Sequence, residues 1–536
     1  MNQIKIVVGY PPINSQKGTP LLSQNRQFQY FNNPTYIYPM IPAFAATMLQ
    51  WAGYRVNWMD GVAQKKSYEA WEKELLELAP DFLILETKAP VVKKHWKIIN
   101  KLKTAAPNLK IVLVGDHVTV FPYESFENSL VDYVIIGGDY DFVAVNLLNH
   151  INNNQNLEGG VYWRKSDQAI KHENPSFFSL KMGEQIANSG PASLAHDLDE
   201  LPFIDRDLTQ WQLYAYDNGN FKYKPGTYVY SGRDCWWGKC TFCVWAHTLN
   251  PFGSYRSFSA QRLFDEVKYL TDKYKFKEIF DDAGTLFVGQ KLKDFCQLMI
   301  KSGYNKKVTL GCNMRFDALT SQDCQLMKQA GFRMVLYGME SGNQATLDRV
   351  NKGQKVEQIA QGAKMASDAG LQVHATVMIG YPWETYQEAK NTINLARECF
   401  NKGYFHTMQA TVVVPYPGTP LWKECREKDW LLTQDYEDYD MRQPVMKSPI
   451  SQEQIMQLTQ ELYSSFLTPR FILRKIMSIR SIEDIKFFIM AGKKLAGHLL
   501  DFDSSQSANW TNPAFWHHSL KAFGNNLIPK KKSKEC

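Results

Sequence analysis

The sequence of 536 residues lacks any apolar run approaching the roughly 20 consecutive residues that a membrane span needs. Its start, Met1 to Gly9, lacks the charged, apolar and cleavage-site pattern of a secretory signal and instead predicts a strand. We therefore expect a cytoplasmic protein with reduced thiols, whose nine cysteines do not form a disulfide framework. No internal repeat is present, which excludes a repeat architecture.

Charge of either sign is not in large excess. The formal net charge is +7, and much of it comes from Lys530, Lys531, Lys532 and Lys534 at the C-terminal end. A short basic tail of this kind is usually solvated, so we expect no nucleic-acid partner. Hydrophobic residues at 44% and charged residues at 21% are typical of a globular protein. The length predicts two or three domains, because single hydrophobic cores stop growing at about 250–300 residues.

Short apolar runs alternate with helical patterns over residues 1 to about 150, which predicts a parallel sheet covered on both faces. The predicted strands are Ile4–Val8, Arg55–Met59, Phe82–Glu86, Ile111–Gly115 and Tyr133–Ile136. Amphipathic stretches between them are Pro42–Gly53, Tyr68–Leu78 and Val92–Ala105. The pattern predicts a doubly wound domain, which binds ligands beyond the carboxyl ends of its strands.

A second β/α series begins at Thr227, after an irregular region with an expected hairpin of Gly160–Arg164 and Ala169–Glu173. Its predicted strands are Thr227–Ser231, Glu278–Asp281, Val308–Cys312, Met334–Gly338, Val373–Ile379 and Met408–Val414. Helical patterns lie at 259–273, 288–302, 320–330, 354–369 and 386–401. Six units predict an open partial barrel instead of the closed barrel of eight. Residues from about 430 onward are expected to be helical.

Three of the nine cysteines are clustered directly after the first strand of the second series. Cys235, Cys240 and Cys243 form a C-x4-C-x2-C array, and the other six are scattered singly, as buried small residues would be. Three thiolates on one loop can hold three irons of a four-iron cluster, which leaves the fourth iron free to chelate a small molecule. His247 lies four residues further on, so the spacing also allows a structural Cys3His zinc site. A zinc module is usually a small self-contained knuckle, and the position at a strand end of a long β/α series favours iron.

The cysteine loop resembles that of radical S-adenosylmethionine enzymes, whose commonest spacing is C-x3-C-x2-C. The following strand ends are similar to motifs of the same family, in order: Phe280–Phe287, Cys312–Asp317, Gly338–Gly342, Ile379–Thr385 and Pro415–Leu421. The resemblance covers roughly residues 195 to 425. It implies a [4Fe-4S] cluster on the three cysteines and S-adenosylmethionine contacts from Asp281, Asp282, Asn313, Arg315, Glu340, Ser341, Gly380 and Glu384.

The N-terminal segments at the strand ends resemble the cobalamin-binding domain that precedes many of these barrels. The implied contacts are Gly9, Tyr10, Pro11, Gly115, Asp116, His117, Gly137, Gly138 and Asp139. The fifth strand ends in Gly-Asp-x-Asp, where relatives usually have Gly-Glu-x-Glu, so the carboxylates are kept but shortened. No Asp-x-His-x-x-Gly occurs in the domain, so no histidine of that type replaces the lower base of the cofactor. We expect His117 to pack near the corrin.

The two resemblances together imply a division into residues 1–155 (cobalamin-binding, Rossmann-like), 156–225 (hairpin and linker), 226–428 (partial barrel) and 429–536 (C-terminal helices). They imply C-methylation of an unactivated carbon through a 5′-deoxyadenosyl radical and methylcobalamin. The alternatives are a non-methylating rearrangement, cyclisation or oxidation on the same cofactors, and a non-catalytic zinc-binding scaffold. The implied partners are a small-molecule, lipid or peptide substrate and an electron donor such as flavodoxin or ferredoxin.

The segment Ser465–Arg474 is amphipathic and basic, and it resembles a C-terminal element of some lipid-acting and pigment-forming relatives. Interfacial membrane contact is one interpretation of this pattern. A helix that packs on the barrel is the favoured one.

Overall fold

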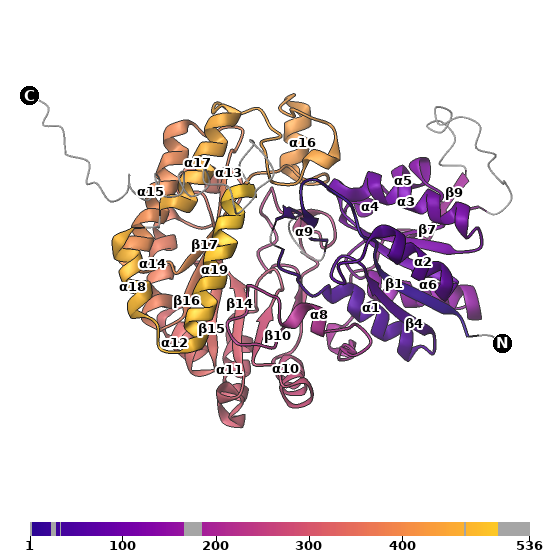
Figure 1. The fold of residues 1–536 in the computed structure, drawn as a ribbon, viewed down its shortest axis with the longest axis horizontal. Helices are drawn as coiled ribbons and strands as arrows, with labels where there is room; N and C mark the ends of the chain where they lie inside the picture. The colour runs from indigo at the N-terminus through magenta and orange to yellow at the C-terminus, as the bar shows by residue number, and fades with distance from the viewer. Residues whose placement is uncertain (1–2, 23–27, 33, 166–184, 466–467, 502–536) are drawn as a thin grey trace, which may run out of the picture.

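The computed structural model describes residues 3–22, 28–32, 34–165, 185–465 and 468–501. Two lobes lie side by side, an N-terminal lobe built on one parallel sheet and a larger lobe built on a second, with the C-terminal helices against the larger lobe (Figure 1). The α/β class and the order of the two lobes agree with the sequence prediction.

The N-terminal sheet contains the five predicted parallel strands and two antiparallel ones. The parallel strands are β1 (Lys5–Tyr10), β4 (Arg55–Asp60), β5 (Phe82–Thr87), β6 (Lys110–Gly115) and β7 (Tyr133–Ile135). The strand order is β4-β1-β5-β6-β7, continued by the antiparallel strands β8 (Val161–Arg164) and β9 (Ile186–Asn188). The order 2-1-3-4-5 of the parallel strands is that of a doubly wound sheet with its switch point between β1 and β5.

Both faces of this sheet are covered, as the continuous apolar strands predict. Ile6 and Val8 pack into one core with α1 (Met40–Trp51) and α6 (Tyr140–Asn153). Val7 points to the opposite face and packs into a second core with α2 (Tyr68–Leu78) and α3 (Val92–Ala105). Alternate residues of one strand thus serve two separate cores.

The hairpin prediction was correct for one strand only. β8 matches the expected first strand, and its partner is β9. The expected second strand, Ala169–Glu173, lies outside the described residues.

The larger sheet has the six predicted strands, all parallel and in sequential order. They are β10 (Gly226–Val229), β13 (Glu278–Asp281), β14 (Thr309–Met314), β15 (Phe332–Glu340), β16 (Gln372–Ile379) and β17 (Thr407–Val412). The intervening helices are α10 (Ala260–Tyr274), α11 (Gln290–Ser302), α12 (Ser321–Gln329), α14 (Val356–Asp368) and α15 (Tyr386–Lys402). β10 and β17 are the two ends of this sheet, so the barrel is open, as predicted from its six units.

Residues 428–451 form no α-helix, so the prediction of a helical chain from about residue 430 onward is wrong for that stretch. The rest of the described C-terminal region is helical and covers the open side of the barrel. It comprises α16 (Pro420–Glu427), α17 (Gln452–Ser465), α18 (Pro469–Met477) and α19 (Ile482–Asp501). The hydroxyl of Tyr463 on α17 accepts from the backbone N of Ala410 on the edge strand β17 and donates to its carbonyl. This pairing satisfies a strand edge that would otherwise be exposed. No helix among the described residues is both long enough and apolar enough to cross a bilayer.

Candidate functional site

The cysteine loop is held at its base by a short antiparallel ladder. β11 (Gly232–Arg233) pairs with β12 (Arg256–Ser257), so residues 234–255 leave and return at one point. Cys235, Cys240 and Cys243 lie within this loop, and all three are free cysteines. Cys243 donates its backbone N–H to the carbonyl of Cys240 at 3.0 Å, which fixes a tight turn between the two.

Burial raises the pKa of the Cys240 thiol to about 12, and it raises that of Cys243 as well. Thiolates at these positions therefore need a cation close by, because burial penalises the charged form. Bound iron supplies that charge. The hydroxyl of Thr285, from the loop after β13, donates to Cys235 Sγ at 3.4 Å. The loop therefore offers three thiols, two of which need a bound cation in their charged form.

His247 does not join the cysteines. Its Nε2 donates to the backbone carbonyl of Cys240 at 3.0 Å. Within the described ranges, no group of three or more His, Cys, Asp or Glu side chains is arranged to hold a metal ion. The structure thus provides no ready-made Cys3His zinc tetrahedron in the part of the chain that it describes.

One cavity of about 1110 Å³ extends from the cysteine loop along the lumen of the half-barrel. All three cysteines line it. The strand residues His374, Thr376 and Gln409 line its interior, and residues of α18 and α19 close the open side. A cavity of this size, apolar with a few convergent polar groups, is typical of a ligand site.

Four of the eight predicted S-adenosylmethionine contacts line this cavity. They are Asp282, Asn313, Arg315 and Glu340. Asn313 donates its amide to the carbonyl of Ala283 at 2.9 Å, which orients it across the strand ends. The four side chains come from the ends of successive strands, because parallel strands deliver their carboxyl ends to one rim.

Arg315 and Glu340 are each paired with another residue of the barrel. Arg315 makes a two-pronged pair with Asp317, Nε to Oδ1 at 3.0 Å and Nη2 to Oδ2 at 2.8 Å, and its guanidinium lies 4.5 Å from the ring centre of Trp237. Glu340 Oε1 accepts from Lys352 Nζ at 2.7 Å. Lys352 also lines the cavity and was missed from the sequence, because it follows α13 (Gln344–Arg349), a short helix that the sequence analysis did not predict.

The other four predicted contacts are engaged elsewhere. Asp281 accepts from the backbone N–H groups of Ser231 and Ala283, and burial raises its pKa to about 6. Ser341 donates to Glu384 Oε1 at 2.7 Å, and both are fully buried. Gly380 has φ of +98°, a conformation that L residues rarely adopt, and marks the turn after β16. These residues link neighbouring strand ends and do not face the large cavity.

The nine predicted cobalamin contacts all lie at the carboxyl edge of the N-terminal sheet, and none lines the large cavity. Tyr10 and Tyr140 donate to the two oxygens of Glu86, the second at 3.0 Å. A cavity beside Tyr10 and Asp60 at this edge holds only about 10 Å³. In this conformation the side chains of the edge fill it.

Asp139 connects the two lobes. Its carboxylate accepts from Arg256 at 2.6 and 2.8 Å, from His196 at 2.7 Å and from Arg233 at 3.3 Å. Asp141 pairs with the same Arg233 at 2.5 Å. The two arginines are paired with each other in the β11–β12 ladder. The acidic turn after β7 therefore forms ion pairs with the base of the cysteine loop.

The carboxylates of Asp139 and Asp141 at this junction are both buried, so solvent screens their charges only weakly. Burial alone would raise the pKa of Asp139, but the hydrogen bonds from His196 and Arg256 hold it well below its usual range. Hydrogen bonds to Asp139 and Glu158 raise the pKa of His196 to about 9. Asp139 and His196 are therefore both charged near neutral pH.

His117 is enclosed by aromatic rings, as expected for a packing histidine. Its ring lies 4.9 Å from that of Tyr436 and 5.6 Å from that of Phe121, and Nε2 contacts Glu124 at 2.7 Å. Asp116 beside it lies 3.9 Å from Lys88 Nζ. Both are buried at the lobe junction.

Residues 229–396 match the model of the Radical SAM superfamily. This part of the chain belongs to that superfamily. The radical SAM domain thus extends from the end of β10 through most of α15, which includes the cysteine loop and the four complete strands β13 to β16. The match favours the iron–sulfur interpretation of the cysteines over the zinc one.

Two curated relatives resemble most of the chain. An uncharacterized methyltransferase of Pyrococcus horikoshii is 26% identical over 82% of this chain and 90% of its own length. The anaerobic magnesium-protoporphyrin IX monomethyl ester cyclase of Rubrivivax gelatinosus is 24% identical over 76% of this chain and 70% of its own. Both similarities extend beyond the radical SAM domain, because each aligned stretch is longer than that domain.

Among solved structures, the cobalamin-dependent S-adenosylmethionine radical enzyme OxsB, with aqua-cobalamin and S-adenosylmethionine bound, superposes with a TM-score of 0.66. The match covers 93% of this chain and 72% of that one at 14% identity. At this identity the likeness establishes the fold: an N-terminal Rossmann-like lobe followed by a partial barrel.

Proposed function

We propose that the protein is a cobalamin-dependent radical SAM enzyme that methylates an unactivated carbon. The observation that carries the proposal is the single cavity in which three free thiols meet polar side chains from successive strand ends of the radical SAM domain. The curated methyltransferase relative supports methyl transfer as the reaction.

Each group has a proposed role. Cys235, Cys240 and Cys243 hold a [4Fe-4S] cluster, and Glu340 and Asn313 bind S-adenosylmethionine beside it, with Asp282 and Arg315 on the same wall. When bound, the cluster and S-adenosylmethionine supply the 5′-deoxyadenosyl radical, and cobalamin supplies a transferable methyl group.

The chain's own residues orient and shield the reacting groups. Carboxylates such as Glu340 attract the cationic amine of the cosubstrate, and the Lys352 ion pair holds that carboxylate in place. Residues of α18 and α19 form one wall of the lumen and limit the access of water, which protects a radical from side reactions. The division of the chain into 1–155, 156–225, 226–428 and 429–536 is part of this proposal.

Cobalamin is proposed for the N-terminal lobe because the fold matches that of OxsB, which was solved with aqua-cobalamin. Leu21, Phe31, Thr35 and Ile37 of this lobe line the large cavity, so a flat macrocycle can lie between the lobes there. The sheet edge with the nine predicted contacts is filled by its own side chains, so binding there requires these side chains to move.

A second candidate is a non-methylating reaction on the same cofactors. The relative named a cyclase favours it, because that protein resembles this chain over a comparable length. An electron donor such as flavodoxin or ferredoxin, a small-molecule, lipid or peptide substrate, and a cytoplasmic location complete the proposal.

Anaerobic reconstitution with iron, sulfide and hydroxocobalamin tests it, with quantitation of iron, zinc and cobalt. We expect about four irons and one cobalamin per chain, and methyl labelling from S-adenosylmethionine then identifies the substrate. Cys240→Ala should lose the cluster and the cleavage of S-adenosylmethionine. Cys399→Ala is the matched control, because that cysteine is buried away from the loop. Zinc without iron would overturn the whole proposal, and iron without cobalamin would remove methylcobalamin chemistry.

A further inference from the structure

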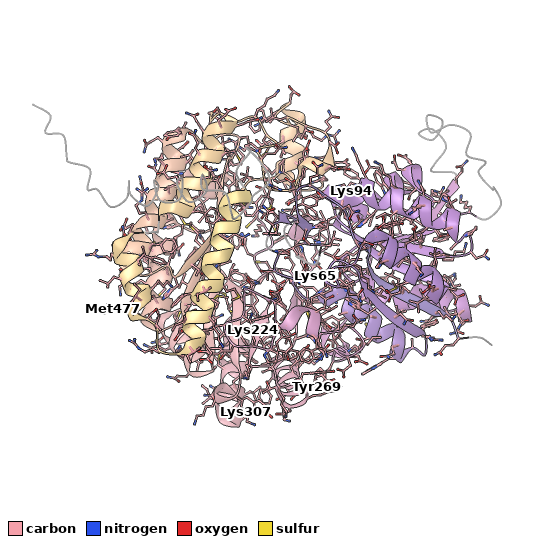
Figure 2. All side chains as sticks on the ribbon, viewed as in Figure 1. Lys65, Lys94, Lys224, Tyr269, Lys307 and Met477 are labelled. Carbon is pink, nitrogen blue, oxygen red and sulfur yellow. The ribbon has the colours of Figure 1, made fainter. Side chains whose placement is uncertain are left out.

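The outward face of α18 and α19 exposes a concentrated set of large apolar side chains. The described residues expose fourteen such side chains, and six of them lie between positions 473 and 489. These six are Leu473 (59% exposed), Ile476 (60%), Met477 (64%), Ile482 (66%), Ile485 (46%) and Ile489 (57%). We call this set the apolar face. Met477 projects from the outer edge of the molecule in Figure 2.

The spacing shows that the six side chains share one side of the helices. Positions 473, 476 and 477 are three and four residues apart on α18, and 482, 485 and 489 are three and four apart on α19. Residues at these separations lie one above the other on a helix. Each of the two consecutive helices therefore presents an apolar stripe to the outside.

The opposite side of the same two helices is attached to the barrel. Arg474 donates to the carbonyls of Phe400 and Asn401 at the end of α15, at 2.9 and 2.8 Å. Asp484 pairs with Lys222 at 2.5 Å. Phe487 and Phe488 line the large cavity. The inner side is thus held by specific contacts, so the exposure of the outer side is a property of the docked helices.

Positive charge accompanies the apolar face. Arg470 on α18 and Lys486 on α19 are exposed, and Arg480 is exposed in the connection between the two helices. Glu483 is an exposed acidic residue there, whereas Asp484 is buried in its pair with Lys222. An apolar helical face with a basic border is the pattern of an interfacial helix that lies in an anionic lipid surface.

We propose that the apolar face docks on the surface of an anionic lipid bilayer, with α18 and α19 lying in the plane of the interface. A second copy of the chain fits this face less well. In a two-fold contact the same patch meets itself, which places the three exposed basic side chains of one copy against those of the other. Acidic headgroups neutralise these charges while the isoleucines enter the acyl boundary.

Docking would place one wall of the cavity against the membrane, because the same helices form both surfaces. This inference does not depend on the proposed reaction. It is tested on protein without added cofactors as well as on the reconstituted enzyme.

The test is co-sedimentation of the full-length protein with vesicles of phosphatidylcholine alone and of phosphatidylcholine with 30% phosphatidylglycerol. We expect binding to the anionic vesicles that weakens at high salt, and weaker binding to the neutral ones. Ile476→Ser with Ile485→Ser should lower the partition coefficient at least about tenfold, because both side chains enter the acyl boundary. Circular dichroism checks that the variant is folded, which its exposed positions predict.

Two controls sharpen the outcome. Trp51→Ser removes a side chain that is 72% exposed on the other lobe and should leave vesicle binding unchanged. Arg470→Glu with Lys486→Glu should weaken binding to anionic vesicles and leave binding to neutral ones unaltered. Equal sedimentation of the wild type and the serine variant would overturn the proposal. So would a dimer in solution that the same serine substitutions dissociate, because a second copy would then cover the face.

Discussion

The carboxyl edges of the two parallel sheets differ sharply, although both are positions where such folds bind ligands. The carboxyl edge of the barrel borders a cavity of about 1110 Å³, which strand-end side chains such as Asn313 and Glu340 line. The edge of the N-terminal sheet is filled by Tyr10, Glu86 and Tyr140, which bond to one another. Its acidic turn reaches across to the barrel through Asp139.

The difference shows that similar sheet topologies use their strand ends for different purposes. The polar groups at the barrel strand ends line a large cavity, whereas the N-terminal sheet uses carboxylates to hold the cysteine loop. The N-terminal lobe therefore acts on the site through Arg233 and Arg256, which flank that loop.

The largest expected effect follows from breaking the junction. Arg233→Met leaves Asp139 and Asp141 with less compensation in a buried site, and removal of one member of a buried pair costs about 3–5 kcal/mol. We expect a lower free energy of unfolding in urea and less iron after reconstitution. Lys65→Met is the control, since its pair with Asp217 is largely exposed. Wild-type iron content in Arg233→Met would show that the junction does not support the loop.

Glu340→Gln tests whether the carboxyl edge of the barrel binds S-adenosylmethionine. The substitution removes a negative charge from the cavity wall, and a hydrogen bond to a charged group contributes about 2 kcal/mol. We expect the affinity for S-adenosylmethionine to fall about thirtyfold in equilibrium dialysis, with the iron content unchanged. The control is Glu424→Gln on α16, which removes the partner of Arg349 outside the cavity. It should leave the affinity for S-adenosylmethionine unchanged. Unchanged affinity in Glu340→Gln would remove this residue from the proposed site.

The junction also predicts a dependence of stability on pH. His196 has its pKa raised to about 9 by Asp139 and Glu158, so its contribution is complete below its ordinary value of 6.5. The contribution is lost as the pH rises from 6.5 through 9, because the unfolded state gives up the proton first. We expect a decrease of about 1–2 kcal/mol in the free energy of unfolding over this window. His196→Gln should flatten the curve there, and an equal decrease in that variant would exclude His196 as its cause.

The smallest expected effect concerns the packed edge. Tyr140→Phe removes the hydrogen bond to Glu86 and should lower the free energy of unfolding by about 1 kcal/mol. Tyr123→Phe, at a partly exposed tyrosine on α5 (Pro122–Asn128), is the control. Thermal unfolding followed by circular dichroism measures both. A loss of several kcal/mol would mean that the Tyr10–Glu86–Tyr140 group is a cooperative network.

Much of the fold was predictable because its signals are local. The eleven predicted parallel strands are all present, and their ends differ from the predicted ones by at most a few residues, since continuous apolar runs between helical patterns mark each strand. The cysteine array was equally visible. The short ladder β11–β12 was not, because two residues a side carry no periodic pattern.

The site was predictable as a set of strand ends but not as a set of contacts. Motif resemblance predicted Asp281, Ser341 and Glu384 as cosubstrate contacts, in the same way as Asn313 and Glu340. Only the tertiary packing shows which of the five line the cavity. Asp281 bonds to Ser231 and Ser341 bonds to Glu384, so these polar groups are used within the protein. Lys352 carried no signal, since a lone lysine after a short helix is usually solvated.

The sequence by itself determined two parallel sheets, their order along the chain and the placement of three cysteines on one loop at a strand end. These follow from periodicity and spacing, which are properties of neighbouring residues. The tertiary structure alone decided that Asp139 faces Arg233 and Arg256 and that, among the described residues, the outer side of α18 and α19 exposes large apolar side chains. The physical reason is that an ion pair or a buried face depends on which distant segment packs against it, and no local pattern records that choice.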